Sequence, residues 1–275
     1  MAVRILLVFA LALLAVPVSA QESQLDVVLK RDKLIVGTYS TSPPLAYVDD
    51  KGELVGFEID MAHQIAKDLL GDPNKVEFVV LQSDGRFPAA LSGKIDFGLC
   101  STTITGDRAV RIAFTRPYLD TGGSIIARKD AGIKSVQELN NNKYTYAILN
   151  VPPAIARAKQ VLPNVTQLLL DSPSALFLAV KTGRATAFAI DKPIADYYEA
   201  ENKDLVRLDT TGTPFAYVSQ DAIFMKPGDF KWWLFLDTWV GELRYGSRYE
   251  FYVAWYQKWL KKDAPPQRFY DYNKY

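Results

Sequence analysis

Short apolar segments alternate with helical patterns along this chain, and this alternation limits the fold more than any other feature of the sequence. Residues 34–38, 76–81 and 95–99 are strand-like runs of apolar side chains between polar or turn-forming neighbours. Between these runs, residues 58–70 carry apolar side chains at helical spacing, and residues 86–91 form a shorter helix pattern. Apolar strands with helices between them predict a mostly parallel sheet that is covered by helices.

The same alternation begins again after residue 127. Strand patterns at 144–149, 165–170 and 185–190 are separated by helix patterns at 153–162, 172–182 and 192–200. An extended segment at 216–224 then precedes two aromatic-rich amphipathic helix patterns at 230–244 and 247–260. The sequence therefore predicts an α/β protein of two lobes, each with a mostly parallel sheet flanked by helices.

The first twenty residues have the pattern of a secretory signal peptide. One basic residue, Arg4, precedes an apolar run at 5–16, and small residues stand near the end of the segment, at 18–20. The run is shorter than the roughly 20 apolar residues that a membrane-spanning helix needs. We therefore expect cleavage after Ala20 and export of a soluble protein, which in a bacterium means the periplasm.

The composition excludes several classes of protein. The 275 residues contain 32 Lys and Arg against 31 Asp and Glu, so the net charge of +1 offers no basic surplus for nucleic-acid phosphates. The single cysteine, Cys100, excludes an internal disulfide. A zinc centre of cysteine and histidine ligands is also excluded, because the chain has only Cys100 and one histidine, His63. Cys100 ends an apolar run, so we expect a buried small hydrophobe rather than a nucleophile. We predict neither a metal nor a cofactor.

Ligands of open α/β sheets bind at the carboxyl ends of the strands, and the candidate site residues follow the predicted strands there. The segment 101–108 offers the hydroxyls of Ser101 and Thr103, backbone N–H groups at a helix start and the guanidinium of Arg108. This set suits a carboxylate, although a capped helix with a solvated arginine has the same pattern. Asp191 follows another strand pattern and could also be the N-cap of the next helix.

Several longer motifs occur in a fixed order. They are Gly52-x-Leu54-Val55-Gly56-Phe57-Glu58-Ile59-Asp60, Arg86-Phe87-Pro88-Ala89-Ala90-Leu91-x-Gly93-Lys94-Ile95-Asp96, Thr103-Ile104-Thr105-x-x-Arg108 and Phe114-Thr115-x-Pro117-Tyr118. With them the chain resembles, over about residues 33–260, the family-3 substrate-binding proteins of bacterial amino-acid ABC importers. The resemblance implies a periplasmic-binding-protein-like fold with two crossover hinge segments, near residues 124–127 and 216–220.

The resemblance also implies roles for single residues. Arg108 would clamp the α-carboxylate of an amino acid, and Thr103 and Ser101 would add hydrogen bonds from the same lobe. Asp191, on the opposite lobe, would pair with the α-ammonium. Lobe 1 would comprise residues 21–121 and 218–275, and lobe 2 residues 122–217. A cation and an anion on different lobes allow a zwitterion to favour the closed form.

Three positions depart from the family pattern. Where these proteins often stack an aromatic ring on the ligand, this chain has Ser42 and Ser83. The second-lobe loop that usually carries Gly-Ser or Gly-Thr has the sequence Asn150-Val151-Pro152-Pro153, and proline lacks the backbone N–H that meets a carboxylate. Asn150 and Tyr39 are the candidates that could compensate. An amino acid or a larger amino-acid-like polar solute is therefore expected.

The leading hypothesis is a monomeric, non-enzymatic binding protein that presents its solute to an ABC permease in the inner membrane. A second hypothesis is a periplasmic cyclohexadienyl (prephenate or arogenate) dehydratase on the same scaffold, with a general acid among Asp84, Asp107, Asp171 and Asp191. A third is a solute-sensing module for a membrane receptor. The Tyr-rich segment 269–275 is either a disordered terminus or a contact surface.

Overall fold

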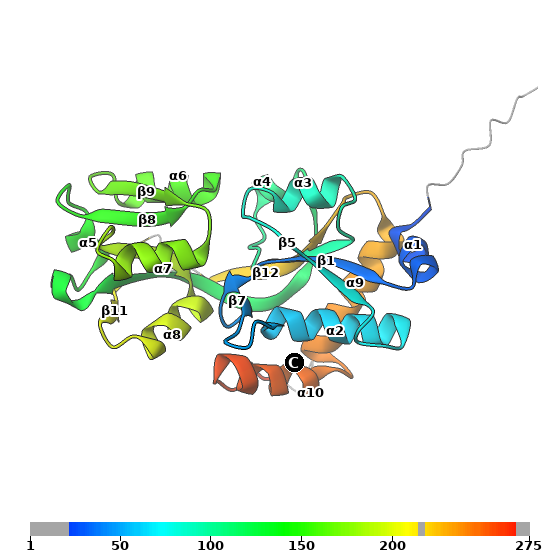
Figure 1. The fold of residues 1–275 in the computed structure, drawn as a ribbon. Coiled ribbons are helices and arrows are strands. Elements are labelled where there is room, and N and C mark those ends of the chain that lie inside the picture. The colour runs from blue at the N-terminus through cyan, green and yellow to red at the C-terminus, as the bar shows by residue number, and fades with distance from the viewer. Residues whose placement is uncertain (1–21, 214–217, 268–275) are drawn as a thin grey trace, which may run out of the picture.

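The structure, a computed structural model, describes residues 22–213 and 218–267. The predicted signal peptide and the Tyr-rich segment 269–275 lie outside these residues, as do residues 216 and 217 of the second predicted crossover. The described chain forms two lobes that share one long strand, β7 (Ala113–Arg128), whose first part pairs with β12 (Val218–Met225) (Figure 1). None of the described helices is both long and apolar enough to cross a membrane.

Lobe 1 is a sheet between helices. Strand β1 (Leu34–Thr38) lies between β5 (Val76–Val80) and β6 (Phe97–Leu99) and is parallel to both. Helix α2 (Phe57–Leu70) packs on this sheet because its apolar residues recur at helical spacing, and it ends at Gly71 in the left-handed conformation. The other helices of this lobe are α1 (Gln24–Arg31), α3 (Arg86–Leu91), α4 (Gly106–Ala109), α9 (Phe230–Tyr245) and α10 (Tyr249–Trp255), and a small separate sheet consists of β2 (Thr41–Ser42), β3 (Ala46–Val48) and β4 (Leu54–Val55).

Lobe 2 has the same kind of architecture. Strand β8 (Thr145–Leu149) is parallel to β9 (Thr166–Leu170) and to β10 (Ala187–Asp191). Its helices are α5 (Val136–Leu139), α6 (Pro152–Val161), α7 (Pro173–Lys181) and α8 (Lys192–Glu201), with a short 3₁₀ turn at Lys129–Ala131 and a last strand, β11 (Leu205–Arg207), paired with β7. The predicted α/β fold, with mostly parallel strands between helices in each lobe, is confirmed.

Strand β7 carries the chain from one lobe to the other. Its first part pairs antiparallel with β12 as far as Gly122, which lies opposite Val218. From Gly123, opposite Asp191, it pairs antiparallel with β10. All the main strands therefore belong to one sheet, in the order β5-β1-β6-β12-β7-β10-β8-β9 with β11 also on β7. Residues 124–127, the first predicted crossover, are already paired with β10, and β7 exchanges partners at the two glycines.

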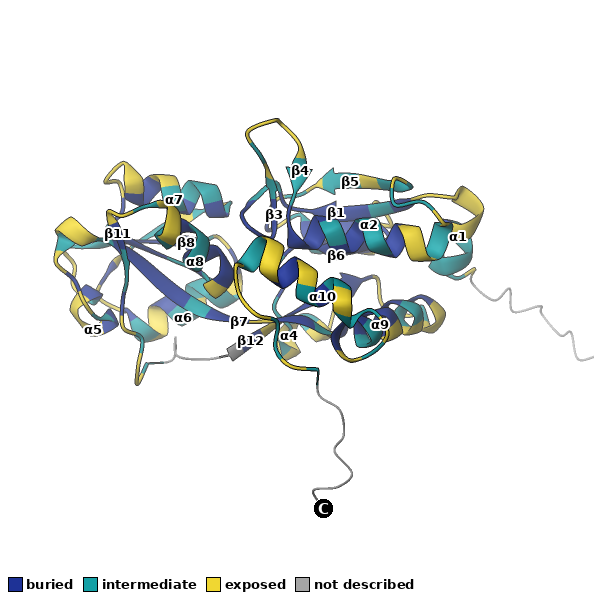
Figure 2. Cartoon of the chain, turned by 90° about the horizontal axis from the view of Figure 1, so that it is seen from below, coloured by how far each residue is buried: buried dark blue, intermediate teal, exposed yellow. Residues whose placement is uncertain are grey.

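Aromatic side chains of the last helices fill the core of lobe 1. Trp232 of α9 is buried, and its indole Nε1 donates a hydrogen bond to the carbonyl of Asp96 at 3.0 Å. The rings of Trp255 and Tyr256 pack edge-on against Phe57 of α2. Figure 2 shows the strands at the centre of the molecule as buried and the loop between β3 and β4 as exposed. The second of the two predicted C-terminal helices is α10 followed by a π-helical turn, Tyr256–Leu260.

Helix α1 was not predicted, because residues 24–31 have the composition of a polar leader. Only Val28 of this helix is buried. Its first turn is held by Asp229, the N-cap of α9, whose carboxylate accepts hydrogen bonds from Ser23 Oγ at 2.8 Å and from the Gln24 backbone N–H at 2.5 Å. These partners are 205 or 206 positions apart, so no local pattern could indicate them.

Candidate functional site

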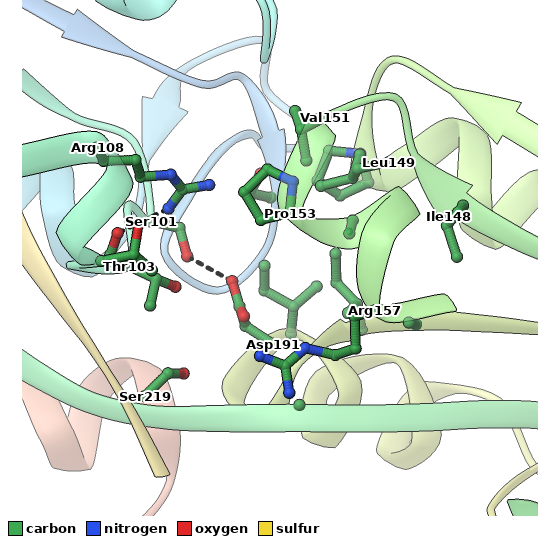
Figure 3. Close-up of a pocket in the computed structure, with 18 of the residues that line it drawn as sticks. Ser101, Thr103, Arg108, Ile148, Leu149, Val151, Pro153, Arg157, Asp191 and Ser219 are labelled. Atoms are coloured by element: carbon green, nitrogen blue, oxygen red, sulfur yellow. Dashed lines mark hydrogen bonds between the residues drawn. The ribbon is translucent and has the colours of Figure 1, made fainter. Parts of the chain in front are cut away.

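A cavity of about 410 Å³ lies between the two lobes (Figure 3). It is lined by residues that follow strands β1, β6 and β10 and by the start of α6, as expected for an open α/β sheet. The polar residues that line it are Tyr39, Ser42, Arg86, Ser101, Thr103, Thr105, Arg108, Tyr146, Arg157, Asp191, Ser219 and Gln220. The structure thus brings together six predicted ligand residues, Tyr39, Ser42, Ser101, Thr103, Arg108 and Asp191, but not Ser83 or Asn150.

Arg108 is half-buried and reaches the cavity from the short helix α4. Its Nη1 donates a hydrogen bond to the carbonyl of Thr103 at 2.6 Å. The loop before α4 is fixed to strand β12, because Ile104 N donates to the carbonyl of Gln220 at 2.9 Å. No carboxylate of the described residues forms an ion pair with Arg108, whose remaining N–H groups are therefore available to an anion.

Ser101 is the point at which three carboxyl groups converge. Its backbone N–H donates to Glu58 Oε1 at 2.7 Å, and its Oγ lies 3.1 Å from Asp191 Oδ2 and 3.0 Å from Asp221 Oδ2. Ser101 adopts φ 45°, the left-handed conformation, which is uncommon for a residue other than glycine. A hydroxyl carries one hydrogen, so it satisfies only one of the two aspartates at a time.

The pKa values of these three carboxyl groups rise because the groups are buried together. Burial raises the pKa of Glu58 to about 7. Burial, and then the charge of Asp191, raise the pKa of Asp221 well above its usual range. Burial likewise raises the pKa of Asp191. A cation that entered the cavity beside Asp191 would offset this repulsion, so this end of the site favours a positively charged group. No group of three or more His, Cys, Asp or Glu side chains in the described part of the chain is placed to hold a metal ion.

Asp191 ends β10 and stands at the N-cap position of α8. Its carboxylate makes no capping hydrogen bond and instead accepts the bond from Ser101, on the other lobe. Figure 3 shows this bond as the link between the two sides of the cavity. Asp191 therefore stands where a helix cap would stand, but its side chain does not cap the helix.

Arg86 is the cavity residue that the sequence interpretation missed. Its motif was noted only as a family match, yet the side chain is 5% exposed and lines the cavity. Its Nη1 donates a hydrogen bond to the Tyr39 hydroxyl, and its buried Nε has no hydrogen-bond partner. The available signal was an arginine in the loop 82–86, which follows the carboxyl end of the predicted strand at 76–81, as Arg108 lies in the segment after the predicted strand at 95–99.

Ser83 and Asn150, both predicted ligand residues, lie around Asp171 instead. Ser83 Oγ donates to the carbonyl of Asp171 at 3.3 Å and accepts from the Tyr39 hydroxyl at 3.2 Å. The Asn150 amide is exposed and lies 3.4 Å from Asp171 Oδ1. Ser42 does line the cavity, and its buried hydroxyl has no hydrogen-bond partner.

The start of α6 forms an apolar wall of the cavity. Pro152 and Pro153 occupy its first positions, and neither has a backbone N–H. The next two N–H groups, of Ala154 and Ile155, both lie 3.1 Å from the carbonyl of Val151. This helix start therefore lacks the free donors that commonly bind an anion.

Cys100 is fully buried and its Sγ lies 3.4 Å from the carbonyl of Gly37. Burial raises the pKa of the thiol, which keeps it protonated and unreactive. The predicted role as a small buried hydrophobe is confirmed.

Residues 34–262 match the family model of bacterial extracellular solute-binding proteins, family 3. The chain is 28% identical over 245 residues to the ABC transporter glutamine-binding protein GlnH of Bacillus subtilis, a match that covers 89% of this chain and 87% of that protein. The structure of the cysteine-binding protein from Campylobacter jejuni is similar with a TM-score of 0.78 and 28% identity, covering 87% of this chain and 94% of that one. The ancestral amino acid-binding protein AncCDT-1, a precursor of cyclohexadienyl dehydratase, is similar with a TM-score of 0.75 and 31% identity, covering 87% and 100%.

Proposed function

The chain belongs to family 3 of the bacterial extracellular solute-binding proteins, and from this premise we propose that it is the binding component of an ABC importer for an amino acid or an amino-acid-like polar solute. The observation that carries this proposal is the pair of opposite charges on opposite walls of one cavity, Arg108 and Asp191. An amino acid presents one anion and one cation at a fixed separation. Arg108 binds the α-carboxylate, and Asp191 binds the α-ammonium with Ser101 and Thr103 beside it.

Closure of the two lobes completes this site. Lobe 1 comprises residues 21–121 and 218–275, and lobe 2 residues 122–217, with the hinge at the partner exchange in β7. Ser101 and Asp191 belong to different lobes, as do Ser83 and Asp171, so their hydrogen bonds form only when the lobes are closed. A ligand that contacts both walls stabilises that closed form, because it binds the open form with fewer contacts. Ser83 and Asn150 then act at the contact between the lobes rather than on the ligand.

The proposed setting is the bacterial periplasm. Residues 1–20 act as a cleaved signal peptide, and the mature protein works as a monomer that delivers its solute to a permease in the inner membrane. A separate sensing role would need a receptor as partner, whereas relatives such as the glutamine-binding protein GlnH are named as ABC transporter components.

Binding without catalysis is favoured over a dehydratase activity. A general acid has to reach the ligand, and Asp84, Asp107 and Asp171 do not line the cavity. Asp84 and Asp107 are exposed, and the remaining candidate, Asp191, already holds the position of the ammonium partner.

The test is calorimetric titration of the purified protein with the amino acid that mass spectrometry finds bound to it. Arg108→Ala should weaken binding by roughly 30- to 1000-fold, because a buried charge on the ligand loses its partner. Asp191→Ala should weaken it comparably, while the melting temperature of the ligand-free protein changes little in either variant. Arg111→Ala, which removes an exposed arginine close to α4, is the matched control and should bind normally. Unchanged affinity in Arg108→Ala would overturn the proposal.

A further inference from the structure

The charges that line the cavity are unequal. Two arginines of lobe 1 line it, Arg86 and Arg108. Of the described residues that line it, Asp191 is the only one with a carboxylate. The α-groups of an amino acid need one cation and one anion, so the lining holds more positive charge than a neutral zwitterion requires.

The side chain of Arg86 is held in the wall of the cavity by burial and by hydrogen bonds. Its side chain is buried, and a chain of hydrogen bonds fixes it: Arg86 donates to the hydroxyl of Tyr39, which donates to Ser83. Ser83 in turn donates to the carbonyl of Asp171 on the opposite lobe. These partners are all neutral, so they orient the guanidinium without balancing its charge. No carboxylate among residues 22–213 and 218–267 forms an ion pair with Arg86.

Arg86 and Arg108 lie close enough to repel each other. Both face the ring of Phe87, with their Cζ atoms 5.1 Å and 5.9 Å from the ring centroid. Burial, and then the charge of Arg86, lower the pKa of Arg108. Two neighbouring like charges, one buried and one half-buried, that form no ion pair with a carboxylate are costly unless an anion meets them.

The carboxyl groups behind Ser101 do not cancel this surplus. Glu58 and Asp221 are buried outside the cavity lining. Because burial raises the pKa of Glu58 to about 7 and that of Asp221 well above its usual value, these two groups supply less than two negative charges at neutral pH.

We propose that the cavity takes an amino acid with a second anionic group, of the class of L-glutamate and L-aspartate. This inference rests on the proposed function: Arg108 binds the α-carboxylate, Asp191 the α-ammonium, and Arg86 the carboxylate of the ligand side chain. Only one hydrogen bond of Arg86, from Nη1 to Tyr39, occupies the guanidinium among the described residues, so its other N–H groups and the unpaired hydroxyl of Ser42 are donors for that carboxylate. A volume of about 410 Å³ is at the small end of ligand cavities, which suits a solute of this size.

Calorimetric titrations with four probes test the proposal: L-glutamate, L-aspartate and their uncharged isosteres L-glutamine and L-asparagine. The protein is first freed of bound ligand by unfolding and refolding. The wild type should bind one of the two dicarboxylic amino acids at least about 30-fold more tightly than its amide, since only the acid provides a charge partner for Arg86. Arg86→Gln should remove most of this preference while retaining affinity for the amide. The control Arg111→Gln removes an exposed positive charge and should keep the preference.

Each other outcome has a distinct meaning. Tighter binding of an amide than of its acid, or tight binding of a different uncharged amino acid only, overturns this inference and leaves the proposed function intact. An equal loss of acid and amide in Arg86→Gln, with a normal melting temperature, also overturns it, because Arg86 would then bind the α-carboxylate. If Arg86→Gln does not fold, the comparison of acid and amide in the wild type still decides. Absence of binding to all four probes also overturns this inference, whereas the proposed function is contradicted only if the solute that mass spectrometry finds bound binds Arg108→Ala as tightly as the wild type.

Discussion

Ser101 shows how much a single residue can organise in this protein. Its left-handed backbone directs the N–H toward Glu58 and the hydroxyl toward Asp191 and Asp221. Three buried carboxyl groups cannot all ionise at low cost in one place, so their pKa values rise. The folded chain thus keeps protons at this point at pH values at which the unfolded chain has already released them.

Glu58 makes this effect measurable. Glutamate in the unfolded chain titrates near pH 4.3, whereas burial raises the pKa of folded Glu58 to about 7. The native state therefore binds the extra proton, and the stabilisation is complete below about pH 4.3 and is lost as the pH rises toward about 7. The shift corresponds to about 4 kcal/mol.

We expect Glu58→Gln to remove this part of the pH dependence. Urea denaturation between pH 5 and pH 8 should show a smaller fall in the free energy of unfolding for the variant than for the wild type, by about 2–3 kcal/mol. The amide retains an oxygen that can accept from Ser101 and Tyr118. Glu77→Gln, at an exposed carboxylate, is the control. Parallel curves for Glu58→Gln and the wild type would contradict the assignment.

At the scale of elements, local sequence patterns were sufficient to predict a helix or strand wherever that element buries one regular face. Helix α2 and strands β1, β5, β8 and β10 were predicted within a few residues, because each has a continuous apolar run or stripe. Helix α1 was missed since Asp229 fixes its first turn from far along the chain. Strand β7 was not predicted as one strand because Pro117, Gly122 and Gly123 interrupt its pattern, although pairing with β12 and β10 extends it over 16 residues.

The turn before α2 provides a prediction for an element boundary. Gly56 has φ 136°, and a Cβ at this position would lie 2.2 Å from the carbonyl oxygen of Leu45. Gly71, after the same helix, has φ 78°, but a Cβ there would meet no atom within 4 Å. Gly71→Ala should introduce only the cost of a left-handed backbone at alanine. Gly56→Ala adds the steric clash with Leu45 and should therefore reduce the free energy of unfolding by at least about 2 kcal/mol more. Equal losses in urea denaturation would show that the close approach to Leu45 is unimportant.

At the scale of the whole molecule, the two lobes contact each other on more than one side of the cavity. Ser83 bonds the backbone of Asp171 beside the cavity. Elsewhere, Lys262 forms an ion pair with Asp196 of α8, and the ring of Tyr47 lies 6.1 Å from that of Tyr197. Exposed ion pairs are individually weak. We therefore expect these contacts to stabilise the closed form only weakly in the absence of a ligand.

Ligand binding should thus both stabilise and compact the protein. At a ligand concentration of 100 times the dissociation constant, stabilisation of about 2.7 kcal/mol should raise the melting temperature by roughly 5–10 °C. The radius of gyration from small-angle X-ray scattering should fall on addition of ligand, because lobe closure is a rigid-body motion. Arg108→Ala should show neither change at the same ligand concentration. A wild-type radius of gyration that ligand leaves unaltered would exclude closure.

The sequence by itself determined the alternation of strands and helices in each lobe, the edge of the sheet at which to look for a site and two charged residues at that edge, Arg108 and Asp191. These features can be predicted because hydrophobic periodicity and the position at which a strand ends are both set by residues close together in the sequence. Only the tertiary structure decided that Arg86 lines the cavity, that Ser83 lies at the lobe contact, and that β7 exchanges partners at Gly122 and Gly123. Each of these depends on segments far apart in the sequence, whose packing against one another no local pattern contains.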